Sequence, residues 1–303
     1  MQYFPLFVDT KELFVLIVGA GEVASRKLDL LARTDANIHV IAPQVAADVE
    51  AYARKGRIKL SRREVSVADM TCYDLIYLAT ANETLNTDLA VIAKQNGIWV
   101  NVVDNPKFCR FITPSIVDRG RLVVAISTAG AAPVFARTIR SRLETLLPNS
   151  LAPLFDYVAT KREDVQLKLT NGKDRRLFWE RFFNLNQDRF DAATESHYQQ
   201  AFDSYASRGE ILLLDENTPA GLLPIAVMPL LQKLDVVFSE NGLDEKTNEL
   251  LRRDASRESL PPLSVISKQF ELGDRMLLVA PAEKITQLKA HFPMAKHLSP
   301  GAI

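Results

Sequence analysis

The residues best placed to do chemistry in this chain are two glycines near its N-terminus and one aspartate a third of the way along. Gly19 and Gly21 belong to a G-x-G-x-x-A pattern that Ala24 completes. Where a strand precedes such a turn and a helix follows it, the glycines let the backbone approach a pyrophosphate, which the helix N–H groups bind. Asp104 follows an apolar run over residues 98–103, and a carboxylate at a strand end can act as a general base.

Both features also have simpler explanations. A glycine turn can join a strand to a helix without binding a ligand, and Asp104 can form an ordinary turn with Asn105 and Pro106. We favour a dinucleotide site because an apolar run precedes the turn and a second one, residues 37–42, follows at the spacing of a βαβ unit. We favour a catalytic Asp104 because of its position at a strand end.

Apolar runs and helical periodicity predict the elements that would position these residues. Strands are expected at 14–18, 37–42, 58–60, 73–80 and 98–103, with helices at 22–31, 45–56 and 86–96 between them. This α/β alternation predicts a parallel, doubly wound sheet of the Rossmann type, which binds ligands beyond the carboxyl ends of its strands. Those ends fall at Gly19, Ala42-Pro43, Thr80-Ala81-Asn82 and residues 101–104.

The end of the second strand bears on the identity of the dinucleotide. An Asp or Glu usually holds the ribose 2′-hydroxyl there, but this chain has Ala42, Pro43 and Gln44. The ribose contact must then come from the backbone or from Gln44. No arginine is present to bind a 2′-phosphate, so the residues alone favour NAD over NADP only slightly.

Composition excludes several classes of protein. The 303 residues carry 37 Lys plus Arg and 37 Asp plus Glu, which does not suit a nonspecific nucleic-acid binder. Cys72 and Cys109 are too few for a disulfide framework and fit a reducing compartment. There is no signal-peptide pattern and no apolar run of membrane-spanning length, so we expect a cytoplasmic protein. The histidines share no ligand spacing, so no resident metal is expected.

Residues 105–142 differ from the rest of the chain in charge. They hold a single acid, Asp118, against seven cations, a local net charge of plus six: Lys107, Arg110, Arg119, Arg121, Arg137, Arg140 and Arg142. A strand is expected at 122–127 and a helix from Pro133 to 147. A polyanionic small-molecule ligand and a merely solvated basic face explain this charge equally well.

The remainder of the chain divides into two further parts. Residues 151–208 are helical in pattern and carry an aromatic cluster that suits a core or a subunit interface: Phe178, Trp179, Phe182 and Phe183. A strand at 210–214 then opens a second stretch of strand–helix alternation that continues to residue 303, and this predicts a small α/β unit.

Several motifs together resemble siroheme synthase, in order and spacing, over about residues 1–208. They are GAGEVASRK at 19–27, ATAN at 79–82, NVVD at 101–104, FITPS at 111–115, VAISTAGAAP at 124–133 and RRLFWE at 175–180. The resemblance implies a bifunctional enzyme, a precorrin-2 dehydrogenase and sirohydrochlorin ferrochelatase. Such an enzyme uses NAD to oxidise precorrin-2 and then inserts ferrous iron, its substrate, to give siroheme.

The resemblance also assigns roles and domains. Asp104 matches the aspartate implicated in both steps, and the cofactor contacts match Glu22, Val23, Pro43 and Gln44. With the strand ends added, the expected cofactor-binding residues are Gly19, Gly21, Glu22, Val23, Pro43, Gln44 and Thr80. The implied organisation is an NAD-binding domain at 1–113, a dimerisation region at 114–150, a helical module at 151–208 and a last unit at 209–303. The family forms homodimers.

Residues 209–303 look like the start of a uroporphyrinogen-III methyltransferase domain. The glycine-rich turn expected after the first strand is replaced by residues 215–219, Asp-Glu-Asn-Thr-Pro, and the segment is short. We therefore expect a degenerate remnant that does not bind S-adenosylmethionine. Two alternatives remain for the chain: a non-catalytic sensor of NAD or tetrapyrrole, and a trifunctional enzyme that also methylates uroporphyrinogen III.

Overall fold

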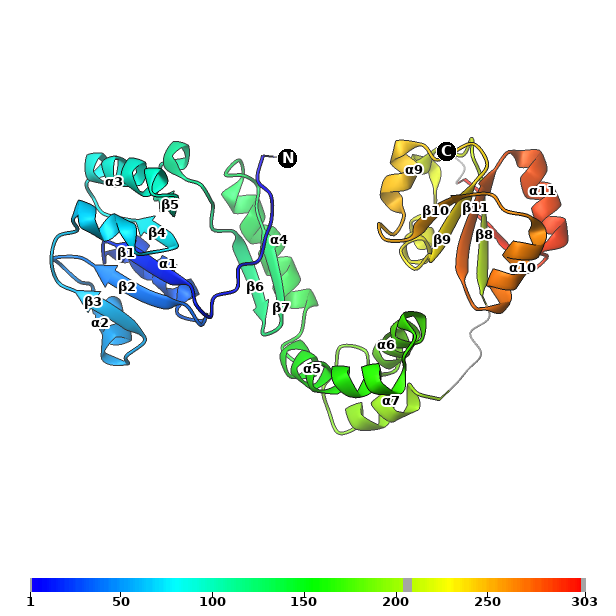
Figure 1. Ribbon diagram of the computed structural model, residues 1–303, viewed down its shortest axis with the longest axis horizontal. Helices are drawn as coiled ribbons and strands as arrows, with labels where there is room; N and C mark the ends of the chain where they lie inside the picture. Colours follow the sequence, from blue (N-terminus) through cyan, green and yellow to red (C-terminus); the bar gives the residue numbers. More distant parts are fainter. Residues whose placement is uncertain (1, 204–208, 301–303) are drawn as a thin grey trace. The chain divides into compact units, whose positions relative to one another are not determined.

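The computed structural model describes residues 2–203 and 209–300 (Figure 1). Contacts divide the chain into two compact units, Met1–His197 and Tyr198–Ile303. Among the described residues, no helix has both the length and the apolar character needed to cross a membrane.

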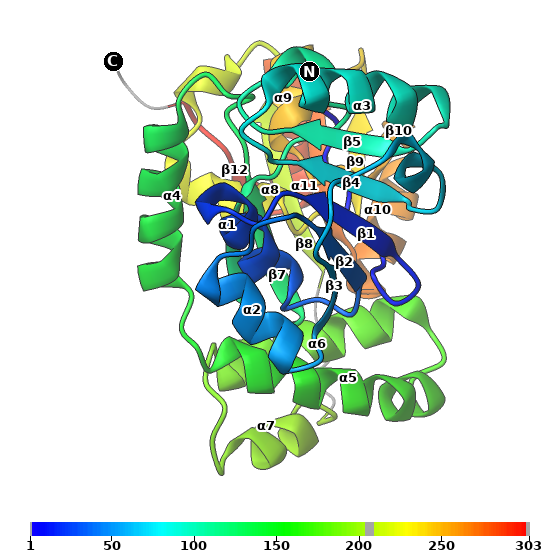
Figure 2. The same cartoon turned by 90° about the vertical axis from the view of Figure 1, so that its left-hand side faces the viewer.

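The first unit begins with a five-stranded parallel sheet. Its strands are β1 (Phe14–Val18), β2 (Asn37–Ile41), β3 (Ile58–Ser61), β4 (Leu75–Leu78) and β5 (Trp99–Val102), in the order β3-β2-β1-β4-β5 (Figure 2). The connecting helices are α1 (Glu22–Leu31), α2 (Ala47–Arg54) and α3 (Glu83–Gln95), with short 3₁₀ turns η1 (Val67–Thr71) and η2 (Pro106–Phe108). The predicted α/β class and Rossmann-like sheet are confirmed.

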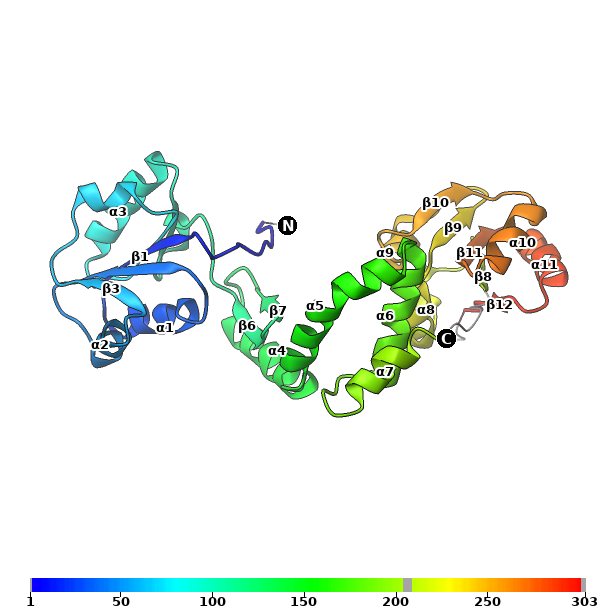
Figure 3. The ribbon, with the colours of Figure 1, turned by 60° about the horizontal axis from the view of Figure 1, so that its bottom comes forward.

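Helices cover both faces of this sheet (Figure 3). Val15 and Ile17 of β1 pack on the face that α1 and α2 cover, whereas Leu16 and Val18 pack toward η1 and α3. All four side chains are buried, as expected for the central strand of a parallel sheet. Because β1 leads to β2 on one side and β4 leads to β5 on the other, the crossovers diverge between β1 and β4, which makes this the topological switch point of the sheet.

A β-hairpin and a long helix follow the sheet. Strands β6 (Ser115–Arg119) and β7 (Leu122–Ile126) pair antiparallel, and α4 (Pro133–Leu146) begins with Pro133 in its first turn. The strand and the helix expected here are confirmed, but β6 was not predicted. A buried Arg119 ties β6 to the end of α4, because its guanidinium pairs with Glu144 at 2.7 Å and donates to the carbonyl oxygen of Leu147.

Three helices make up the next part: α5 (Leu151–Lys168), α6 (Gly172–Asn186) and α7 (Thr194–Gln200). The expected helical module is confirmed up to residue 203, and residues 204–208 lie outside the described part. Phe178 and Phe182 are fully buried and contact Trp179 edge-on at 5.0 and 5.8 Å between ring centroids. The aromatic cluster is therefore a core of this module.

The second unit contains a parallel sheet in the order β10-β9-β11-β8-β12. Its strands are β8 (Glu210–Asp215), β9 (Val236–Ser239), β10 (Ser256–Ser259), β11 (Arg275–Ala280) and β12 (Lys296–His297). Its helices are η3 (Ala220–Leu222), η4 (Ile225–Val227), α8 (Met228–Leu231), α9 (Glu245–Leu250), α10 (Leu263–Glu271) and α11 (Ala282–His291). The predicted α/β character of this unit is confirmed.

A buried histidine links three segments of the first sheet. His39 on β2 is 9% exposed, and its Nδ1 lies 2.5 Å from the hydroxyl of Tyr73 while its Nε2 lies 2.8 Å from Ser61 Oγ on β3. Burial lowers the pKa of His39; the nearby cations Lys59 and Arg63 lower it further, and Asp69 opposes them. Folding therefore disfavours protonation of this ring.

The histidine should make the stability of the first unit depend on pH. Below its ordinary pKa of 6.5, the unfolded chain takes up a proton that folded His39 does not bind, so stability decreases as pH falls. We expect the urea midpoint of the wild type to drop between neutral pH and about pH 5, and His39→Gln to show a smaller drop. His291→Gln, in the second unit, is the control and should behave as the wild type. Equal pH dependence in His39→Gln would contradict this assignment.

Candidate functional site

The glycine turn after β1 is built around close backbone contacts. Gly19 has φ of +100°, and its N–H donates to the carbonyl of Ile41 at 2.9 Å. A Cβ at Gly19 would lie 2.5 Å from the carbonyl oxygen of Ala79 at the end of β4. Gly19 is therefore required by the fold itself, since it lets β1 and β4 end side by side at the switch point.

Gly21 is different, because it faces open space. It precedes α1 with an extended backbone, and a Cβ built on it would meet no atom within 4 Å. No side chain among the described residues caps the start of α1. The helix therefore presents its first N–H groups outward, as a phosphate site requires. The buried hydroxyl of Ser25, one turn along, also has no hydrogen-bond partner in the described structure.

The other predicted cofactor residues lie at the same carboxyl edge. Glu22 and Val23 open α1 and are exposed, and Glu22 pairs with Arg26. Pro43 and Gln44 follow β2 and are exposed as well. The sheet thus brings together residues 19–23 with Pro43 and Gln44, which are distant in sequence.

Thr80 lies at this edge, but its hydroxyl is engaged in the turn after β4. Thr80 Oγ1 donates to Asn86 Oδ1 at 2.7 Å and accepts from the N–H of Asn82 at 3.2 Å. The buried Asn86 side chain returns a hydrogen bond to the carbonyl of Thr80 at 2.9 Å. The side chain of Thr80 therefore shapes the turn after β4.

Asp104 follows β5 in an exposed turn with left-handed backbone geometry, φ +57°. Residues other than glycine rarely adopt this geometry, although Asp and Asn tolerate it better than most. The turn reading from the sequence and the position at the carboxyl edge are thus both correct. The backbone presents the carboxylate to solvent just past the last strand of the sheet.

Sequence reasoning did not single out Lys27 as a site residue. It lies on α1, half-buried, with Nζ 6.0 Å from the ring centroid of Tyr77 on β4. Burial lowers the pKa of Lys27, and the charges of Asp104 and then Cys109 raise it again. One feature of the sequence could have indicated it: Lys27 stands three residues after Ala24, among the apolar positions of the same helix face.

The seven cations of residues 105–142 do not act as one group. Arg119 is buried and forms an ion pair with Glu144, so it is not available to a ligand. Arg121 forms an ion pair with Asp156 at 2.9 Å. The remaining five are exposed: Lys107, Arg110, Arg137, Arg140 and Arg142. Among the described residues, no group of His, Cys, Asp and Glu could hold a metal ion.

Comparison with known proteins follows the same divisions of the chain. Residues 6–115 match a family model described as "Putative NAD(P)-binding", residues 119–146 one for the central part of sirohaem biosynthesis proteins, and residues 150–202 one for the sirohaem synthase dimerisation region. A siroheme synthase of Pseudoalteromonas atlantica is 39% identical over 266 residues, and one of Yersinia pestis 37% identical over 303 residues.

The chain is similar to siroheme synthases along most of its length.

The matches cover most of this chain but only part of each relative. The two relatives align with 85% and 97% of the chain, so the likeness reaches into the second unit. The chain in turn spans only 58% and 64% of their lengths. A solved structure of SirC, a precorrin-2 dehydrogenase, covers 67% of the chain with a TM-score of 0.54 and 24% identity, which supports the fold. The dimerisation-region model falls on α5 to α7 rather than on residues 114–150.

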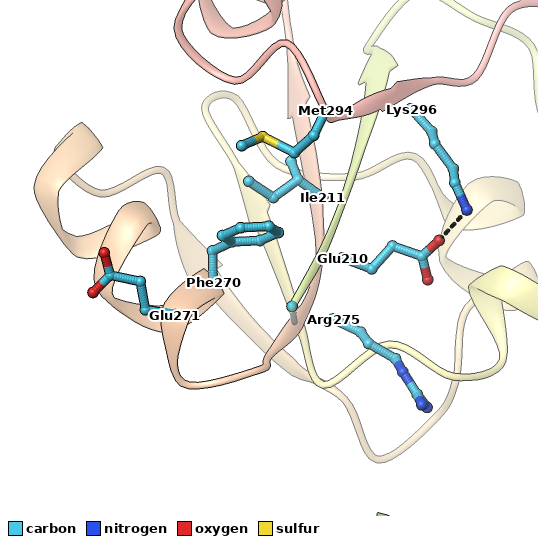
Figure 4. Close-up of a pocket in the computed structure, with 8 residues that line it drawn as sticks. Glu210, Ile211, Phe270, Glu271, Arg275, Met294 and Lys296 are labelled. Carbon is cyan, nitrogen blue, oxygen red and sulfur yellow. Dashed lines mark hydrogen bonds and ion pairs between the residues drawn. The ribbon is translucent and has the colours of Figure 1, made fainter. Parts of the chain in front are cut away.

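The second unit has a hollow of about 730 Å³ at the edge of its sheet where strands β8 and β11 begin (Figure 4). Glu210 and Arg275, the first residues of β8 and β11, line it, and Ile211, Phe270 and Met294 supply apolar contacts. Ligands of parallel sheets bind beyond the carboxyl ends of strands, whereas this hollow lies at the amino ends. It does not mark the position where a methyl-donor site was expected.

Proposed function

We propose that this chain oxidises precorrin-2 to sirohydrochlorin with NAD⁺ and then inserts ferrous iron to give siroheme. The observation that carries the proposal is the carboxyl edge of the first sheet. There an uncapped helix start with open space at Gly21 lies at the switch point, and Asp104 follows the outer strand β5. Similarity to siroheme synthases supports the choice of substrate and reaction.

The chain's own residues fit a dinucleotide. The first N–H groups of α1 bind the pyrophosphate, and Gly21 leaves room for it. We propose that Gly19, Glu22, Val23, Pro43, Gln44 and the backbone of Thr80 complete the contacts. When bound, NAD⁺ supplies the acceptor for the hydride that the macrocycle loses. The absence of an acid after β2 leaves the ribose to Gln44 and the backbone.

We propose that Asp104 moves protons in both steps. In the oxidation, one hydrogen leaves the macrocycle as hydride and another leaves as a proton, which the carboxylate accepts. In the insertion, two pyrrole nitrogens lose their protons as iron enters, and the same carboxylate can receive these protons one at a time, passing the first to solvent before it accepts the second. Iron is a substrate in this scheme, so no resident metal site is needed.

The remaining cations suit the substrate. Precorrin-2 carries many carboxylates, and the five exposed cations on η2 and α4 and near them attract anions without making the whole chain basic. We propose that Arg137 and Arg140, which lie one turn apart on α4, bind substrate carboxylates.

We propose that the chain functions as a homodimer in the cytoplasm. Large apolar side chains are exposed on the N-terminal segment and α4, including Phe4 at 80%, Phe7 at 73% and Val134 at 67%. Burial of these side chains against a second copy would explain their exposure in the single chain. Both cysteines are free, as in a reducing compartment.

Incubation of the full chain with precorrin-2 and NAD⁺ tests the function directly. We expect the absorbance of NADH and of sirohydrochlorin to rise together, and added ferrous iron to convert the product to siroheme. A sensor of NAD or tetrapyrrole would bind both compounds without changing either spectrum with time. That result would overturn the proposal in favour of the non-catalytic alternative.

We propose that the second unit does not bind S-adenosylmethionine. The turn after β8 carries two acids where a close backbone approach is needed, and both are engaged. The carboxylate of Asp215 accepts the N–H of Asn217 at 2.9 Å, and that of Glu216 accepts from Asn241 Nδ2 at 2.9 Å. Calorimetry with S-adenosylmethionine should give no heat of binding, and uroporphyrinogen III should remain unmethylated. Methylated product would favour the trifunctional alternative.

A further inference from the structure

Cys109 has no part in the proposed chemistry, yet its side chain lies against the turn that carries Asp104. It follows η2 and packs, half-buried, against the apolar cluster that β5 and α3 share. The N–H of Arg110 donates to the carbonyl of Val100 at 2.8 Å, so residues 109 and 110 run along the outer side of β5. Because β5 is the last strand of its sheet, this segment covers an edge that no other strand of the described structure pairs with.

The thiol of Cys109 bonds to the backbone of Val102 where a neighbouring strand would otherwise do so. Val103 donates its N–H to Leu78 of β4 at 3.0 Å, so the backbone groups of Val102, one residue earlier, point away from the sheet. Cys109 Sγ accepts the N–H of Val102 at 3.2 Å and lies 3.2 Å from its carbonyl oxygen, to which the S–H can donate. Val102 is buried, and a buried N–H without a partner is unfavourable, so the sulfur satisfies a group that the sheet leaves open.

The same sulfur contacts the other end of the turn. The N–H of Asn105 donates to the carbonyl of Val102 at 3.3 Å, which closes a β-turn over residues 102–105. Cys109 Sγ lies 3.4 Å from the carbonyl oxygen of Asn105, so its one proton can serve either of two carbonyls. Asp104 stands third in this turn with φ of +57°, a position that favours glycine or asparagine. The thiol thus holds the first and last residues of a turn whose third residue has an unfavourable backbone.

We propose that Cys109 is a positioning residue for Asp104, because its thiol joins both ends of the turn and so fixes the backbone that presents the carboxylate. The inference rests on the proposed function, in which Asp104 is the base, and deepens it. A residue other than glycine keeps left-handed geometry only where its surroundings hold it. A base acts efficiently only within hydrogen-bond reach of the proton it takes. Loss of the thiol should therefore slow the reaction although the carboxylate is still present.

The chain offers a conservative variant and a matched control. Cys109→Ser keeps a group that both donates and accepts hydrogen bonds at the same position, whereas Cys109→Ala removes both functions. The control is Cys72→Ala, because Cys72 is the other free cysteine, is exposed, and follows η1 with its sulfur 3.4 Å from Thr71 Oγ1. Comparison of the three separates the bonds of Cys109 from the mere loss of a thiol.

The first test needs no substrate and uses amide hydrogen exchange of the full chain, followed residue by residue by NMR. In Cys109→Ala, the N–H groups of Val102 and Asn105 should exchange about tenfold faster or more, because the first loses its acceptor and the second loosens with the turn. The N–H of Val103 should exchange as in the wild type, since its partner is on β4. Cys109→Ser should stay near the wild type. Unaltered exchange of Val102 and Asn105 in Cys109→Ala would overturn the proposal.

The second test measures the reaction. Cys109→Ala should lower kcat for precorrin-2 oxidation by roughly tenfold, the consequence of a misplaced base. The KM for NAD⁺ should be unchanged, because the proposed pyrophosphate site lies at the start of α1. Cys109→Ser should restore most of the rate, and Cys72→Ala should match the wild type. A kcat of Cys109→Ala equal to that of the wild type would contradict the role in the reaction.

A double variant distinguishes the positioning of Asp104 from a general effect on folding. If Cys109 acts through Asp104, Cys109→Ala should cause no further loss of rate once Asp104→Asn has removed the base. An equal loss in both backgrounds would show that Cys109 supports only the fold. A wild type without turnover would instead defeat the proposed function, while the exchange test would still decide whether Cys109 holds the turn.

Discussion

Asp104→Asn should lower the rate of precorrin-2 oxidation by about a hundredfold or more, the usual scale for loss of a positioned base. Iron insertion should fall as well, since the amide cannot accept the pyrrole protons. Affinity for NAD⁺ should change little, because the proposed pyrophosphate site lies at the start of α1, on a different segment.

The backbone decides which substitution tests this cleanly. Asp104 has φ of +57°, where asparagine is tolerated but alanine is strained by about 1–2 kcal/mol. Asp104→Ala would therefore disturb the turn as well as remove the base. Asparagine retains the shape and the turn, so a lost rate can be attributed to the lost proton acceptor.

Rates would be followed by the absorbance of NADH for oxidation and of siroheme for insertion, with sirohydrochlorin supplied for the second assay. Asp88→Asn on α3 is the matched control, as an exposed carboxylate on the helix that covers the far face. If Asp104→Asn retained both rates near those of the wild type, Asp104 would be a turn residue only, and the base would lie elsewhere.

The sheet and its ligand edge could be predicted because they follow from local patterns. Buried parallel strands appear as continuous apolar runs. The run FVLIV at β1 is too short for a helix and precedes a glycine turn, so it predicts a buried strand. The boundaries were less certain. Helix α3 begins at Glu83, three residues before the predicted start, because Asn82 caps it by accepting the N–H of Leu85.

Features that depend on distant partners could not be predicted. Within the described part of the chain, strand β6 pairs with β7 alone, and its Ser-Ile-Val-Asp-Arg run has no clear alternation to reveal it. Arg119 was counted among the cations available to a ligand, yet it is buried against Glu144, 25 residues away. Pro153 lies in the first turn of α5, where its missing N–H removes no helical hydrogen bond.

The candidate site shows the same division. Residue types and order located Gly19, Gly21 and Asp104 at strand ends. They did not reveal that Gly19 is needed for close backbone packing, whereas Gly21 leaves open space at the edge of the sheet. That difference depends on the carbonyl of Ala79, which follows another strand. Lys27 was missed for the same reason, since Tyr77, the ring over which its ammonium group lies, comes from β4.

Gly21→Asp should greatly weaken NAD⁺ binding while leaving the folded unit intact or slightly more stable. Gly21 is the N-cap of α1, with extended backbone and no atom within 4 Å of a built Cβ, so an aspartate fits without strain. Aspartate is a good N-cap, and its carboxylate would accept the same N–H groups that the pyrophosphate needs. Relative to glycine, the cap should stabilise the helix by a few tenths of a kcal/mol.

The two effects have opposite signs, which makes the prediction specific. The carboxylate both occupies the N–H groups and repels phosphate, so the affinity for NAD⁺ should fall by about a hundredfold or more by calorimetry. The thermal midpoint without ligand should stay level or rise. Gly21→Ala should have a weaker effect, because it adds bulk without charge. Gly19→Ala should instead unfold readily, because its Cβ would collide with the carbonyl of Ala79.

Iron insertion into supplied sirohydrochlorin should survive in Gly21→Asp, since Asp104 is untouched. Undiminished NAD⁺-dependent oxidation in a folded Gly21→Asp would place the pyrophosphate away from α1.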